Sequence, residues 1–169
     1  MSKKLSKAYV ICRGGILTGI TALFQSAPVL LPAIGMALSP LSSLPVLLAA
    51  VIDIPMGIVV LLSSAIIIFM VSPQEAIIFI LTTGPLGFAI GCLLYRKGWI
   101  LTLLLSSVCL FTGTVVLTYI VDIPALGDLS KSFSLSIVLF YLIFAFIYSS
   151  LWTFCTRKLI SMLRKLGLI

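Results

Sequence analysis

The sequence contains no histidine, and only four of its 169 residues are acidic. Histidine is a frequent zinc ligand and a common base beside a nucleophilic serine or cysteine, so its absence argues against both kinds of site. The sequence also lacks a Walker loop, the glycine-rich motif that cradles nucleotide phosphates. We therefore expect no enzyme activity, no metal site and no cofactor.

The few acidic residues all fall at predicted loops or helix ends, and none lies inside an apolar run. A proton-relay pump or an intramembrane metalloprotease needs ionisable groups within the bilayer, so the sequence predicts neither. The acidic residues are Asp53, Glu75, Asp122 and Asp128.

Charged residues make up only 9% of the chain, whereas hydrophobic residues make up 62%. A soluble domain of this length needs more polar surface than such a composition supplies. The composition therefore predicts an all-α integral membrane protein. The four cysteines show no paired spacing, so we expect them to behave as small apolar side chains.

The segment Ala76–Tyr95 carries no charge over twenty residues and is followed directly by Arg96–Lys97. Twenty helical residues span the hydrocarbon core of a bilayer, about 30 Å thick, so this segment predicts a transmembrane helix. Pro85 near its midpoint predicts a kink. Gly87 and Gly91 form a GxxxG motif, which allows a neighbouring helix to lie close.

The eleven Lys and Arg residues cluster at the chain ends and in one loop, and positive residues stay on the cytoplasmic side of a membrane. We interpret the clusters as signals of topology and expect no nucleic-acid partner. They predict six transmembrane helices with both termini cytoplasmic. In this topology, Lys131 is the only basic residue on the outer side of the membrane. The predicted spans are Gly14–Leu38, Leu41–Ile52, Ile54–Val71, Ala76–Tyr95, Trp99–Ile120 and Phe133–Phe154.

The two ends of the chain differ in character from the spans between them. Residues 1–13 form a basic cytoplasmic N-terminus, which we expect to be kept rather than cleaved as a signal peptide. Residues 14–154 form the transmembrane domain. In residues 155–169, basic and apolar side chains occupy opposite arcs of a helix, so we expect an amphipathic surface helix on the cytoplasmic leaflet.

The first two spans carry unusual local signals. Gly15 and Gly19 form a second GxxxG motif, and Thr18, Thr21 and Gln25 place polar groups on one side of the first helix. Ordinary hydrogen bonding between helices is one explanation for that polar side. The second span is short and bounded by proline, a pattern that in transporters points to a binding cavity. Asp53 is placed to cap the third helix, and Ser72 or Gln74 the fourth.

The chain resembles the substrate-binding S component of energy-coupling factor (ECF) transporters. The resemblance rests on three features. The chain has six predicted spans with small residues near the start of the first. Leu44–Ala50 is similar to that group's Leu-Pro-x-Leu-Leu-Ala run, and Pro73–Lys97 is similar to its fourth helix. The chain is also similar to the YybS-like membrane proteins over its six spans.

The resemblance implies a multi-pass protein of the bacterial plasma membrane. It would bind a small nutrient, such as a vitamin or its precursor, and associate with a transmembrane coupling subunit and two ATPase subunits. The implied coupling surface comprises Gly15, Thr18, Gly19 and Ala22. The candidate substrate-binding residues are Gln25, Ser26, Ser42, Ser43, Glu75 and Asp122.

Each of these assignments has an alternative. The small residues of the first helix could pack inside the protein, and Glu75 and Asp122 could serve only as helix-end or loop residues. For the whole chain, the alternative is a non-transporting membrane scaffold or regulator that uses its GxxxG faces for assembly. Saturable binding of a small molecule distinguishes a transporter subunit from a scaffold.

Overall fold

The computed structural model describes residues 7–94, 98–123 and 135–165, and regular structure within these ranges is entirely helical. The elements follow one another with very short connections where the chain is continuous. They are α1 (Lys7–Leu30), α2 (Pro32–Leu38), the 3₁₀ turn η1 (Ser39–Ser42), α3 (Ser43–Ile52), α4 (Ile54–Val71), α5 (Pro73–Ile78), the π-helical turn η2 (Phe79–Thr83), α6 (Gly84–Leu93), α7 (Trp99–Tyr119) and α8 (Leu135–Lys165).

Six helical units of the described residues are long and apolar enough to cross a membrane, as expected of a multi-pass membrane protein. They are Val10–Leu30, Pro32–Ile52, Ile54–Val71, Pro73–Leu93, Trp99–Tyr119 and Leu135–Met162. The predicted helical class is confirmed, and the structure has the expected six helices of spanning length. The orientation was predicted largely from Lys3, Lys4, Arg96, Lys97 and Lys131, which lie outside the described residues.

The break between the first two spans lies earlier than the sequence indicated. We expected α1 to be irregular beyond Ala27 and the second span to begin at Leu41. Instead, α1 includes Pro28 and continues to Leu30, and the second span begins at Pro32. Leu31 leaves the helical conformation (φ −138°, ψ 80°), consistent with the bias of residues before proline against the α region. The second span is therefore of ordinary length but composite, built from α2, η1 and α3.

The sixth span and the basic tail form one helix, α8, of 31 residues. This differs from the predicted boundary at Phe154, which separated a span from a surface helix. At about 1.5 Å per residue, α8 is about 46 Å long and exceeds the thickness of a hydrocarbon core. Its buried side chains recur at steps of three or four; they are Tyr141, Ala145, Ser149, Thr153, Thr156 and Ile160.

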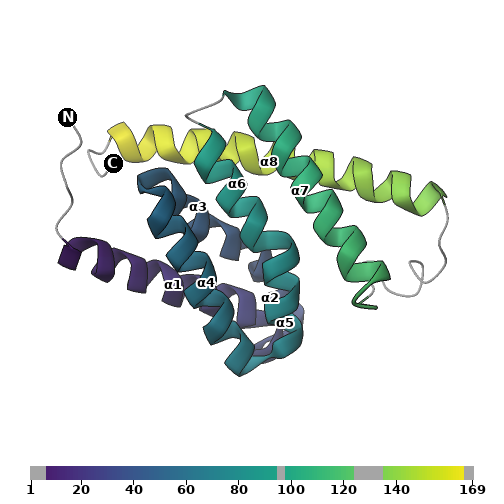
Figure 1. Ribbon diagram of the computed structural model, residues 1–169, viewed down its shortest axis with the longest axis horizontal. Helices are drawn as coiled ribbons and strands as arrows, with labels where there is room; N and C mark the ends of the chain where they lie inside the picture. Colours follow the sequence, from purple (N-terminus) through teal and green to yellow (C-terminus); the bar gives the residue numbers. More distant parts are fainter. Residues whose placement is uncertain (1–6, 95–97, 124–134, 166–169) are drawn as a thin grey trace.

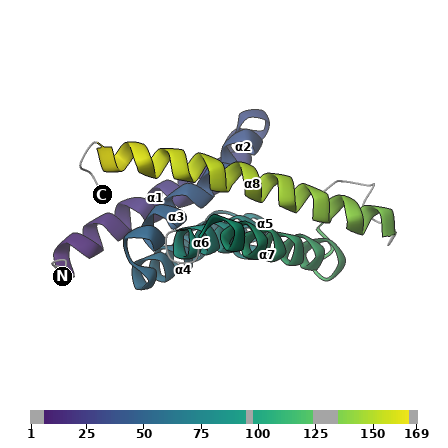
Figure 2. The same cartoon turned by 90° about the horizontal axis from the view of Figure 1, so that it is seen from above.

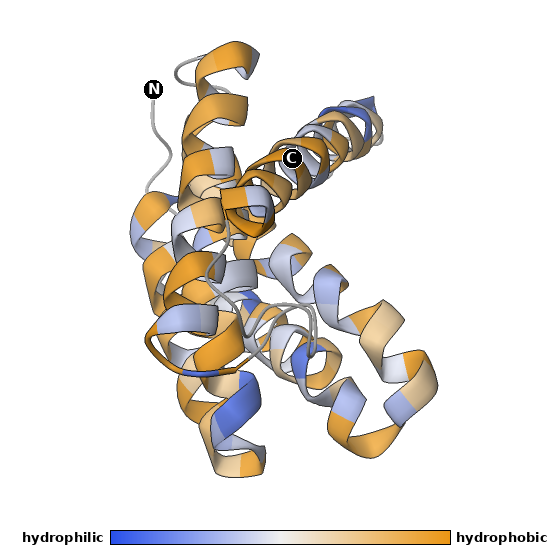
Figure 3. Ribbon diagram, turned by 90° about the vertical axis from the view of Figure 1, so that its right-hand side faces the viewer, coloured by the Kyte–Doolittle hydropathy of each residue, from blue (hydrophilic) through white to orange (hydrophobic). Residues whose placement is uncertain are grey.

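The helices form a layer that α8 crosses. In Figure 1, α4, α6 and α7 slope in the same general direction, while α8 runs across them; Figure 2, seen from above, separates α8 from that layer. α3 packs on α4 and α6, α6 on α7, and α7 on α8. The outward faces are apolar (Figure 3), with Met70 81% and Leu135 84% exposed, as lipid contact requires.

Glycines bring α3 and α6 into backbone contact. A Cβ atom at Gly87 would collide with the carbonyl group of Ser43, and one at Gly91 with the carbonyl of Leu47 and the side chain of Ala50. The predicted close approach of a helix to this GxxxG motif is confirmed, and the neighbour is α3.

The irregularity predicted at Pro85 takes the form of the π-helical turn that precedes it. The backbone N–H of Gly84 donates to the carbonyl of Phe79, five residues earlier, at the end of η2. Proline has no N–H, so it cannot bond the carbonyl of Leu81 four residues before it. Gly113 of α7 packs against that same carbonyl and leaves no room for a Cβ atom. Thus η2 lies directly against α7.

Candidate functional site

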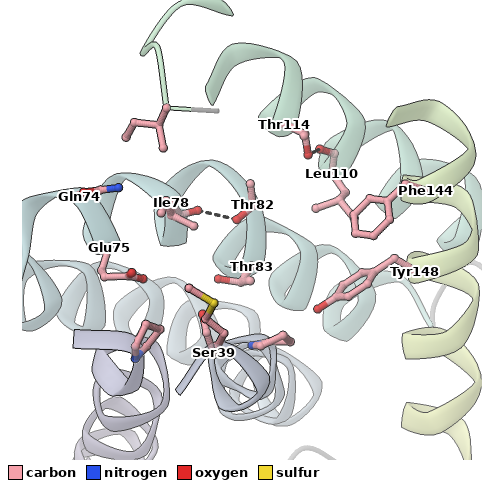
Figure 4. A pocket seen from close by; sticks show the side chains of 14 residues that line it. Ser39, Gln74, Glu75, Ile78, Thr82, Thr83, Leu110, Thr114, Phe144 and Tyr148 are labelled. Atoms are coloured by element: carbon pink, nitrogen blue, oxygen red, sulfur yellow. Dashed lines mark hydrogen bonds between the residues drawn. The ribbon is translucent and has the colours of Figure 1, made fainter. Parts of the chain in front are cut away.

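A cavity of about 500 Å³ lies where α1, α2, η1, α5, η2, α7 and α8 converge (Figure 4). It lies near the turn at Ser72 and near the end of α7. The sequence predicts that both places lie on the outer side of the membrane. The lining residues come from segments far apart in the sequence. They are Pro28, Met36, Ser39, Pro40, Gln74, Glu75, Ile78, Thr82, Thr83, Leu110, Thr114, Ile123, Phe144 and Tyr148.

Among the described residues that line this cavity, Glu75 alone is charged, and we call it the Glu75 cavity. The sequence from Ser72 to Glu75 has the pattern of a capping box, in which the two side chains bond each other's backbone N–H groups. Only half of the box forms: the Ser72 hydroxyl accepts a hydrogen bond from Glu75 N at 3.4 Å, but Ser72 N donates to the carbonyl of Ile68. The Glu75 carboxylate therefore does not cap α5, although Ser72 does, as predicted.

The carboxylate instead bonds Gln25, which is fully buried on α1. Gln25 Nε2 donates to Glu75 Oε2 at 2.9 Å, and Gln25 Oε1 accepts from the hydroxyls of Ser42 (2.8 Å) and Thr83 (3.0 Å). We call these four residues the Gln25 network. It joins α1, η1, α5 and η2 through side chains, and buried networks satisfied in this way rigidify a site.

Two aromatic side chains of α8 form another wall of the cavity. Phe144 and Tyr148, one helical turn apart, have ring centroids 5.6 Å apart with planes tilted by 30°. Tyr148 also meets Trp152 edge-on at 6.2 Å. In Figure 4 these rings lie across the cavity from Glu75, with Thr83 between them in the view.

The structure brings three of the predicted substrate-binding residues together: Gln25, Ser42 and Glu75 belong to one network. Of these, only Glu75 lines the cavity, and the other two lie behind it. Gln25 and Ser42 are 50 and 33 positions from Glu75 in the sequence, so only the tertiary fold brings the three residues together. Hydrogen bonding between helices, the alternative considered for the polar side of α1, accounts for Gln25.

The other three predicted residues lie elsewhere. Ser43 donates to the carbonyl of Pro40 at 2.8 Å. Ser26 is buried, and its hydroxyl has no hydrogen-bond partner among the described residues. Asp122 is exposed, with a left-handed backbone (φ 61°), in the turn after α7; its neighbour Ile123, not Asp122, lines the cavity.

The predicted capping role of Asp53 is wrong. Asp53 occupies the N-cap position of α4, but its side chain accepts no hydrogen bond there. Pro55 lies in the first turn of α4, where backbone N–H groups have no partner within the helix. Because proline has no N–H, this helix start has one fewer unpaired donor and needs less capping.

The small residues of α1 divide into two pairs. No atom of the described residues outside α1 lies within 4 Å of a Cβ atom built at Gly15 or Gly19. In contrast, Ala22 belongs to the core, and the carbonyl of buried Thr18 accepts a hydrogen bond from Ser64 at 3.4 Å. Packing inside the protein, the alternative for all four, therefore applies to Thr18 and Ala22 only.

Gly15, but not Gly19, lines a second cavity of about 470 Å³ at the opposite end of the bundle from the Glu75 cavity. Its lining includes Gly14, Gly15 and Thr18 of α1, and Asp53 and Met56 beside the start of α4. The exposed side chains Ile11 and Leu23 extend the face on which Gly15 and Gly19 lie. We call this surface the α1 glycine face.

Sequence reasoning missed several residues that line the Glu75 cavity, notably Thr82, Thr83, Phe144 and Tyr148. Two signals were available. Adjacent threonines before Gly84–Pro85 indicate a helix whose regular hydrogen bonding fails at that point. The second signal is the spacing of Phe144, Tyr148 and Trp152 on α8, at steps of four. Tyr141 on the same helix is instead buried, with its hydroxyl 3.2 Å from that of Thr118 on α7.

No known family, curated protein or solved structure proved similar to this chain. Within the described residues, no group of histidine, cysteine, aspartate or glutamate side chains is placed to hold a metal ion. The functional argument therefore depends on the Glu75 cavity, the Gln25 network and the α1 glycine face.

Proposed function

We propose that this chain is the small-molecule-binding subunit of an importer of the energy-coupling factor type. It spans the plasma membrane of a bacterium six times with both termini in the cytoplasm, and it takes up a small nutrient such as a vitamin or its precursor. A transmembrane coupling subunit and two ATPase subunits supply the energy. The observation that carries this proposal is the Glu75 cavity, backed by a preorganised polar network.

The Glu75 cavity has the properties of a ligand site. Its volume, about 500 Å³, falls in the range of about 300–1,000 Å³ typical of small-molecule pockets. Its lining is mostly apolar, with a few polar groups such as Ser39, Thr83 and Glu75, which is the usual composition of such pockets. Irregular backbone beside it, in η1 and η2, is tolerated at membrane depth where it lines a cavity.

The α1 glycine face supports a partner in the membrane. Helices associate in lipid through small residues that let backbones approach closely, and none of the residues described by the structure fills the space beside Gly15 and Gly19. This face alone would also serve a scaffold, the alternative function. The cavity is what favours a solute-binding subunit over a scaffold.

The test is copurification from the native membrane with a coupling subunit and two ATPases. Gly19→Leu should abolish this association, because the leucine occupies the space that the partner helix needs. Thr112→Leu, on the exposed side of α7, is the matched control and should leave association unchanged. Both variants are expected to elute from size-exclusion chromatography as the wild type does, since neither side chain points into the core.

Copurification that survives Gly19→Leu would reject the α1 glycine face as the docking surface. If the wild-type protein copurifies with partners but shows no saturable binding of a small molecule, the result would favour the scaffold function instead.

A further inference from the structure

The threonines that line the Glu75 cavity present hydrogen-bond acceptors to a ligand. A threonine hydroxyl has one proton to donate, and at three lining threonines that proton is already used. Thr82 donates to the carbonyl of Ile78 (2.6 Å), Thr114 to that of Leu110 (2.8 Å) and Thr83 to Gln25 Oε1 (3.0 Å). Toward a ligand, these hydroxyls offer only lone pairs.

The carboxylate of Glu75 adds a negative charge to the same cavity. Its Oε2 atom accepts one hydrogen bond, from a neutral amide, and the carboxylate has no ion pair or further partner among the residues that the structure describes. Within the part of the chain that the structure describes, no basic residue lines the cavity, although the whole chain has a net charge of +7. A half-buried carboxylate without a cation beside it is costly, and a ligand that brings a positive charge removes that cost.

The aromatic wall suits the same kind of ligand. Phe144 and Tyr148 present rings on the side of the cavity opposite Glu75 (Figure 4), beside the apolar side chain of Leu110. Aromatic faces bind flat apolar groups by stacking and also attract cations through the ring quadrupole. The cavity therefore has a charged, acceptor-rich end and a flat apolar end.

We propose that the ligand of the Glu75 cavity is a small organic cation: a protonated amine or amidine that bonds Glu75, attached to a planar apolar group that stacks on Phe144 and Tyr148. This inference rests on the proposed small-molecule-binding function and names its substrate class. Gln25 is a positioning residue, because it holds the carboxylate without lining the cavity.

Binding of three probes of similar size and different charge tests this proposal. Purified protein is titrated with 2-phenylethylamine, 2-phenylethanol and 3-phenylpropanoate in equilibrium dialysis. The cation is expected to bind saturably and at least about tenfold more tightly than the neutral probe, as a charge-assisted hydrogen bond implies. Glu75→Gln, which keeps the size and the acceptor for Gln25, should remove this preference. Asp53→Asn makes the same charge change at the other end of the bundle and should have no effect.

The other outcomes separate this proposal from the function it rests on. Equal or tighter binding of the alcohol or the anion, or a preference that survives Glu75→Gln, would overturn the cationic class and leave the small-molecule-binding function standing. Mass spectrometry of small molecules retained by protein from native membranes gives the second readout: a retained amine supports the class, and a retained anion contradicts it. If nothing is retained and no probe binds saturably, both the class and the function fail.

Discussion

Gly87→Leu is expected to destabilise the native fold strongly. The new side chain would meet the carbonyl group of Ser43 on α3, and backbone cannot move aside as a flexible side chain can. Overpacking costs about 1–3 kcal/mol where neighbours adjust, so we expect at least about 3 kcal/mol against backbone. For a chain of this size that loss lowers the melting temperature by roughly 6–12 °C. Thermal unfolding in detergent, followed by size-exclusion chromatography, measures it.

The control for Gly87→Leu is Gly19→Leu, the same substitution at the second glycine of the α1 motif. Gly19 has open space beside it, so this variant should melt within about 2 °C of the wild type, the usual range for surface changes. Equal melting temperatures of the two variants would show that α3 and α6 are not in backbone contact.

Gln25→Leu is expected to destabilise the protein by at least about 3 kcal/mol, because it removes the shared partner of three polar side chains. Each buried polar group left unpaired costs about 1–3 kcal/mol, and fully buried Ser42 has no water to replace the bond. Ligand binding should weaken as well, since the Glu75 carboxylate loses the amide that positions it. Thermal unfolding with and without ligand measures both effects.

Thr21→Val is the matched control for Gln25→Leu. Thr21 lies one turn before Gln25 and is fully buried, but its hydroxyl bonds only the carbonyl of Leu17 in the same helix, at 2.8 Å. That carbonyl keeps its backbone partner, so the loss should stay below about 1 kcal/mol. If Gln25→Leu costs no more than Thr21→Val, the Gln25 network does not hold this end of the bundle together.

The two GxxxG motifs show how far sequence reasoning reaches. Their spacing predicts close helix packing at both, yet Gly87 contacts the backbone of α3 whereas Gly19 faces open space. Local sequence gives no way to distinguish a motif used within the chain from one left for a partner, because the difference depends on where other helices lie. In the same way, polarity singled out Gln25 and Glu75 separately, but only the fold brings them together.

Helix boundaries were the least predictable part of the fold. Pro28 is accommodated inside α1, whereas Pro32 starts a new element, although both are prolines within one apolar run. The basic residues after Phe154 indicated a separate surface helix, but residues 154–158 contain neither glycine nor proline, so nothing local ends α8 there. Ile160, expected on the apolar arc of a surface helix, is instead buried and belongs to the hydrophobic cluster that includes Ile90 of α6 and Ala145 of α8.

The central claim is that the Glu75 cavity opens to the outside of the cell, and cysteine accessibility tests it most directly. Ser39→Cys, in a variant whose four native cysteines are replaced by alanine, places a thiol on the cavity wall. Asp53→Cys, exposed at the opposite end of the bundle, serves as the reference. We expect a membrane-impermeant thiol reagent to label Ser39→Cys in intact cells and Asp53→Cys only after the membrane is opened. Labelling of Asp53→Cys in intact cells, with Ser39→Cys reached only after opening, would contradict the account.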